Sequence, residues 1–66
     1  MNEEEIYYQI DYLQGDILDL ERELNTMHFY AYHIAKDRTG LDEQTKPLED
    51  KIASLEAEID ELYKLL

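Results

Sequence analysis

Residues 6–34 read IYYQIDYLQGDILDLERELNTMHFYAYHI, and their apolar side chains recur at alternating intervals of four and three residues. The recurring positions are Ile6, Ile10, Leu13, Ile17, Leu20, Leu24, Met27, Ala31 and Ile34. This spacing places one continuous apolar stripe along a helix and is typical of a coiled coil. A second series continues the pattern with Leu48, Ile52, Leu55, Ile59, Leu62 and Leu66. The sequence therefore predicts an all-α protein in which two helices pair along these stripes.

The heptad positions also indicate how the helices pair. Isoleucine at position a with leucine at d favours two-stranded packing. With Ile10 at position a, the isoleucines at a are Ile10, Ile17, Ile52 and Ile59, and the leucines at d are Leu13, Leu20, Leu55 and Leu62. In a parallel homodimer of the first helix, Asp16 at position g would face Glu21 at position e of its mate. This like-charge pairing disfavours a parallel arrangement. We therefore expect a two-helix antiparallel coiled-coil hairpin.

Turn and capping residues lie between the two series, in the segment DRTGLDEQTKP (residues 37–47). Gly40 is suited to the left-handed conformation that ends a helix, and Pro47 is tolerated in a first helical turn. Thr45 is then the expected N-cap of the second helix. The expected single domain, residues 1–66, consists of helix one at about 3–38, a loop at about 39–45 and helix two at about 46–66.

The heptad phase also continues through this segment, at Arg38, Leu41 and Thr45. A bent continuous rod is therefore the alternative to the hairpin. The rod would place Arg38 and Thr45 in the helix seam and a proline in the middle of a helix, which costs a hydrogen bond.

The expected helices differ in length, at ~54 Å and ~31 Å for 1.5 Å per residue. If helix two folds back, its far end reaches only about residues 17–20 of helix one. The apolar side chains before that point would then lack a partner within the chain, and exposing each one forfeits ~1.5–3 kcal/mol. We therefore expect self-association into a dimer, with a four-helix bundle as one form. The residues expected to mediate it are Ile6, Ile10, Leu13 and Ile17.

Acidic residues dominate the composition, with 17 Asp and Glu against 6 Lys and Arg and a net charge of −11. Such a chain should be repelled by nucleic acids and anionic membranes and attracted by basic proteins. In the expected hairpin, residues 1–25 and 55–66 form the end that carries the termini, with 12 acids and 2 bases. The acids are either an ordinary solvated helix face or a surface for a basic partner protein. The candidate partner-binding carboxylates are Asp16, Asp19, Glu21 and Glu23.

Aromatic and imidazole side chains crowd the segment MHFYAYHI (residues 27–34). On the heptad, His28 and Tyr30 flank the seam and are interpreted as its cover. Phe29 and Tyr32 point away from the seam on the outer face. Outward aromatic side chains usually mark a contact with another protein or a second copy. Phe29 and Tyr32 are therefore further candidates for partner binding.

Several classes of function find no support in the sequence. His28 and His33 are five residues apart, ~140° around a helix, so they do not share a metal ion, and no cofactor or phosphate-binding motif occurs. The only serine, Ser54, has no histidine near it on the heptad. We therefore expect no enzyme, no cofactor and no metal site. The absence of cysteine, of an N-terminal signal pattern and of a long apolar run fits a cytoplasmic protein.

No motif in the chain is specific to one family. In composition, the chain resembles the small acidic inhibitors that phages and mobile elements use against basic host or defence proteins, some of which are DNA mimics. The leading hypothesis is a non-enzymatic coiled-coil protein that self-associates and binds another protein, as an acidic inhibitor of a nucleic-acid-binding target. The alternative is a structural oligomerisation or scaffold element whose acids provide only solubility.

Overall fold

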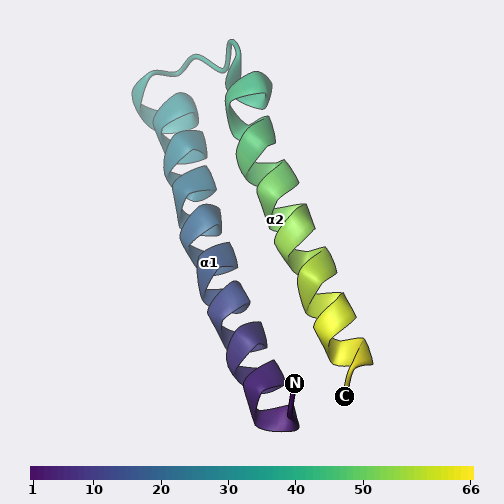
Figure 1. The fold of residues 1–66 in the computed structure, drawn as a ribbon. Helices are drawn as coiled ribbons and strands as arrows, with labels where there is room; N and C mark the ends of the chain where they lie inside the picture. Colours follow the sequence, from purple (N-terminus) through teal and green to yellow (C-terminus); the bar gives the residue numbers. More distant parts are fainter.

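The computed structural model describes residues 1–66 and confirms the all-helical hairpin. Helix α1 (Glu3–Phe29) continues into a π-helical turn, η1 (Tyr30–Ile34), and helix α2 (Leu41–Lys64) runs back alongside it. Both termini lie at the same end of the molecule (Figure 1), whose principal extents are 49 × 16 × 10 Å. The chain is therefore folded back on itself and is not a continuous rod.

The first turn of α1 is stabilised by its own sequence. The side-chain oxygen of Asn2 accepts a hydrogen bond of 2.8 Å from the backbone N–H of Glu5, which satisfies one of the free donors of the helix start. The three glutamates at positions 3–5 also place negative charge next to the positive end of the helix dipole. This cap stabilises the start of α1, which lies at the same end of the hairpin as the C-terminal end of α2.

The π-helical turn moves Ile34 out of the seam. The backbone N–H of Ala35 donates to the carbonyl of Tyr30 at 2.8 Å, five residues back, so this turn holds one residue more than an α-helical turn. Ala31 is buried, but Ile34, which the heptad predicts to be buried, is 60% exposed. Helix one also ends here, four residues before the predicted boundary at 38. The heptad assumes an unbroken α-helix, and the wider turn rotates later side chains away from the predicted face.

Helix α2 begins at Leu41, five residues before the predicted start. Thr45 is therefore not its N-cap: it lies in the seam, 2% exposed, and its hydroxyl donates to the carbonyl of Asp42 at 3.3 Å. Gly40 does adopt the expected left-handed conformation (φ 73°), but it precedes α2 and does not end helix one. Pro47 lies inside α2 and not in its first turn. Leu41 and Thr45 are buried in the same heptad phase as the later seam residues. This burial offsets the free-energy cost of the hydrogen bond that Pro47 removes.

The longer α2 removes the predicted overhang of helix one. Ile6 and Ile10 are 3% and 4% exposed and form a core with Ile59 of α2. Leu13, Ile17 and Leu62 pack against this core. The premise that Ile6, Ile10 and Leu13 lack a partner within the chain is therefore wrong. At 1.5 Å per residue, α2 supplies ~35 Å of helix, which matches the ~37 Å between Ile6 and Ala31.

The two glycines should respond oppositely to alanine. At Gly40 we expect Gly40→Ala to lower the free energy of unfolding by ~1–2 kcal/mol, because an L-residue is strained at this positive φ. At Gly15, inside α1, we expect Gly15→Ala to raise it by ~0.5–1 kcal/mol through helix propensity. An added Cβ meets no atom within 4 Å at either site, so backbone conformation alone decides the sign. Urea denaturation followed by circular dichroism measures both, and equal effects at the two sites would contradict the assigned conformations.

Candidate protein-binding site

Negative charge gathers at the end of the hairpin that carries both termini. Because Ile17 packs against the core of Ile6, Ile10 and Ile59, residues 18–25 of α1 lie beyond that core, beside the first half of α2, and not at this end. The acidic end is therefore residues 1–17 with residues 55–66, which hold nine acids and one base, net −8. The remaining residues, 18–54, hold eight acids and five bases, net −3. The hairpin thus concentrates most of the charge on less than half of the chain.

The four candidate carboxylates of α1 are only partly at this end. Asp16 is half-buried within the acidic end, whereas Asp19, Glu21 and Glu23 are exposed along the middle of α1. Asp19 lies 4.0 Å from Arg22, with both side chains well exposed, so solvent screens this pair and it adds little to stability. The carboxylates that surround the termini were also predicted to lie at this end, but they were not among the predicted partner-binding candidates.

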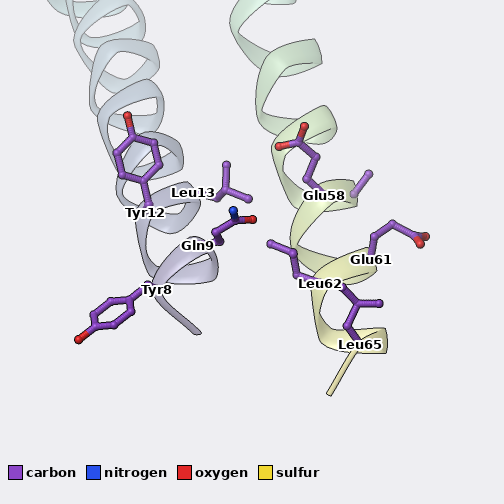
Figure 2. A pocket seen from close by; sticks show the side chains of 9 residues that line it. Tyr8, Gln9, Tyr12, Leu13, Glu58, Glu61, Leu62 and Leu65 are labelled. Carbon is purple, nitrogen blue, oxygen red and sulfur yellow. The ribbon is translucent and has the colours of Figure 1, made fainter. Parts of the chain in front are cut away.

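An apolar groove opens between the two helices within the acidic end, with a volume of about 810 Å³. Figure 2 shows Gln9 and Leu13 of α1 pointing toward α2, and Leu62 of α2 pointing toward α1. Tyr8 and Tyr12 belong to α1 and line the border of the groove that is farther from α2. We call this feature the terminal groove; its lining residues are Tyr8, Gln9, Tyr12, Leu13, Ala57, Glu58, Glu61, Leu62 and Leu65.

Part of the terminal groove is visible in the heptad pattern. Gln9, Glu58 and Leu65 all occupy position g, which in a hairpin of matched arms lies along one side of the seam. An exposed leucine at such a position is the available signal. The sequence predicts helices of unequal length, which leave Gln9 without an opposing helix. The predicted hairpin therefore has no groove at this position.

The aromatic segment near the loop forms two separate clusters. Phe29 is exposed, and its ring lies 4.9 Å from that of His33, between centroids. Tyr32 makes an edge contact with His28 at 6.3 Å, and the guanidinium of Arg38 lies 5.1 Å from its centroid. Phe29 and Tyr32 thus point outward as predicted, but each ring contacts a different neighbour.

His28 and Tyr30 do not cover the seam as predicted. Both side chains are exposed, although Tyr30 does line a second, smaller hollow beside Ala31 and Leu41. Ala31 and Leu41 are both buried, so they fill the seam at this level. No further cover is therefore needed there.

The loop contains one perturbed titratable group, Asp37. The Thr39 hydroxyl and then the Thr39 backbone N–H, at 3.0 Å, hold the pKa of this carboxyl below its usual value. A lowered folded-state pKa contributes stability above the unfolded-state pKa, and that contribution is lost as the pH falls through the folded value. Asp37 lies in the loop at the end of the hairpin opposite the termini, so its hydrogen bond with Thr39 shapes the turn and it takes no part in the acidic end.

No group of three or more His, Asp or Glu side chains is arranged to hold a metal ion. Neither α1 nor α2 combines the length and apolarity needed to cross a membrane. No protein-family model matches the chain. No curated protein and no solved structure matches it either.

Proposed function

We propose that this hairpin is a non-enzymatic binding protein whose acidic end docks on a basic surface of another protein. The observation that carries the proposal is the charge distribution: the fold joins two acid-rich segments, distant in sequence, into one end with net charge −8. Charge of one sign on a small surface attracts an oppositely charged partner and speeds their encounter. The absence of cysteine is compatible with action in the cytoplasm.

The specific target class that we propose is a nucleic-acid-binding protein, which the hairpin would inhibit by occupying its basic surface. Duplex DNA carries one negative charge per ~1.7 Å of its axis. The acidic end is ~25 Å long, so its net charge corresponds to one unit per ~3 Å. A single hairpin thus offers about half the charge density of DNA, enough to compete for a basic surface at low salt.

Exposed apolar side chains favour a second candidate function, an oligomerisation element. Only 6 of the 66 residues are buried, whereas tyrosine, phenylalanine and leucine side chains are exposed along both helices. Ile6 and Ile10 are used inside the hairpin, so self-association through the predicted set Ile6, Ile10, Leu13 and Ile17 would require the hairpin to open. A dimer of intact hairpins would instead use exposed side chains, with Phe29 and Tyr32 as candidates for this contact or for one with the partner.

Two charge variants test whether the acidic end binds. One neutralises the end at exposed sites outside the terminal groove, with Glu5→Gln, Asp11→Asn, Glu56→Gln and Asp60→Asn. The matched variant carries Asp19→Asn, Glu21→Gln, Glu23→Gln and Glu49→Gln, all at exposed sites outside the acidic end. Each removes four charges from −11 and leaves −7, so only the location of the loss differs.

Immobilised wild type and variants are presented with the heparin-retained fraction of a cell lysate, which is rich in basic nucleic-acid-binding proteins. We expect wild type to retain a basic protein at low salt and to release it at ~0.5 M salt. The end-neutralised variant should show association about tenfold slower, and the matched variant a smaller change. DNA binding by the retained protein should fall when the hairpin is added. Equal retention by all three proteins, independent of salt, would show that the acidic end is not the binding surface.

A further inference from the structure

The terminal groove combines a half-buried apolar floor with exposed apolar side chains on its borders. Leu13 points toward α2 and Leu62 points toward α1 (Figure 2). On its borders, Tyr12 is 72% exposed and Leu65 is 63% exposed. Both helix ends also contain polar residues. Large apolar side chains that line a groove, unlike isolated ones, are typical of a protein-binding surface. The groove therefore offers a partner apolar contacts in addition to charge.

Charge determines which partner fits. Glu58 and Glu61 line the terminal groove, and the surrounding acidic end has a net charge of −8. Lys64, the one base of this end, is already paired with Glu61 at 3.0 Å. A second copy of the chain would bring another acidic end against this one, and like charges brought together lower affinity. A cationic segment gains attraction at the same place.

The shape of the groove indicates a helical segment. Its α2 side runs from Ala57 to Leu65, which is ~13 Å of helix and matches two to three turns of a ligand helix. A helix that lies between two others buries apolar residues spaced i, i+3 or i+4, and i+7. Its flanking lysines or arginines can then reach Glu58 and Glu61 and lie over the tyrosine rings as cation–π partners.

We propose that the terminal groove binds a short basic amphipathic helix of the partner protein, so that the hairpin and this helix form a three-helix arrangement. This inference rests on the proposed function, because it places the apolar part of the same contact at the acidic end. The apolar floor anchors the partner helix, and the carboxylates at the border select its charge.

The probe is a synthetic peptide of about 15 residues, with leucines at helical i, i+4 and i+7 spacing and lysine or arginine at the other positions. Its control has the same composition in a shuffled order, which keeps the charge and removes the apolar stripe. Binding is measured by fluorescence anisotropy. We expect the amphipathic peptide to bind at least about tenfold more tightly than the shuffled one.

The protein variants separate the groove from the charge. Tyr12→Ser with Leu65→Gln removes two exposed groove residues, and Tyr7→Ser with Leu18→Gln removes two exposed apolar residues outside it. Circular dichroism checks that both remain helical. The groove variant should lose about tenfold in affinity for the amphipathic peptide, and the control variant should bind like wild type.

Three results would overturn the inference in distinguishable ways. If both peptides bind wild type equally and only salt weakens them, the groove is not used, while the proposal of an acidic binding end stands. If neither peptide binds, both proposals fail. If sedimentation shows a wild-type dimer that the groove variant loses, the groove is occupied by a second copy and not by a basic helix.

Discussion

Ile10→Asp is expected to unfold the hairpin, whereas Leu18→Asp should leave it folded. Ile10 is 4% exposed and packs in the core with Ile6 and Ile59, so a carboxylate there loses its hydration without gaining a partner. The cost, above ~4 kcal/mol, is comparable to the entire stability of a domain this small. Leu18 lies on the same helix but is 55% exposed, so the same substitution should change stability by less than ~0.5 kcal/mol.

Circular dichroism at several protein concentrations measures both variants. The helical signal of the Ile10→Asp protein should be lost at every concentration, because the broken contact lies within one chain. A variant that regains helicity at high concentration would indicate that Ile10 packs between chains. A similar loss in the Leu18→Asp protein would show that the exposed face of α1 is covered by a partner or a second copy.

Ile59→Ala is expected to lower the free energy of unfolding by ~2–4 kcal/mol, the second largest effect. Ile59 is the one buried residue of α2 in the core at the acidic end, and its truncation removes apolar contacts and leaves a cavity. The Gly15→Ala protein is the suitable background, since its added stability keeps the variants folded.

A double-mutant cycle connects this effect to the other helix. In that background, Ile6→Ala and Ile59→Ala should cost less together than the sum of their separate effects, with a coupling of ~0.5–2 kcal/mol, because the two side chains belong to one core. Urea denaturation gives all four free energies. Strict additivity would mean that Ile6 and Ile59 do not pack together and that the start of α1 has no partner in α2.

Most of the fold follows from local pattern. The spacing from Ile6 to Ala31 predicts which face of α1 is buried, and the series from Leu48 onward does the same for α2. The predicted start of α2 is five residues too late, because Thr45 and Pro47 have the residue types of a helix start but lie inside the helix. Leu41 already lies in that phase, and its burial decides the boundary.

The site was harder to predict than the fold for a related reason. The set of carboxylates at one end of the molecule depends on how far α2 extends along α1. Because the predicted start of α2 is five residues too late, residues 18–25 were assigned to the acidic end, whereas they lie beside the first half of α2. The π-helical turn was also unpredictable, because it depends on where the chain leaves the seam and not on a residue type. The outward orientation of Phe29 and Tyr32 was predictable from the heptad, because Phe29 precedes this turn and Tyr32 lies within it.

The acidic end and its groove both require that α2 fold back along the full length of α1. The chain has no cysteine, so spin labels can be attached at Asp11→Cys and Asp60→Cys, two exposed sites on the two helices at the acidic end. Excess unlabelled protein ensures that pulsed electron paramagnetic resonance reports distances within one chain, even if hairpins associate. The hairpin predicts a distance below ~35 Å, because packed helices have axes 8–10 Å apart and the labels add length at each side. A distance near ~74 Å, as in a continuous helix over the same 49 residue steps, would contradict the account.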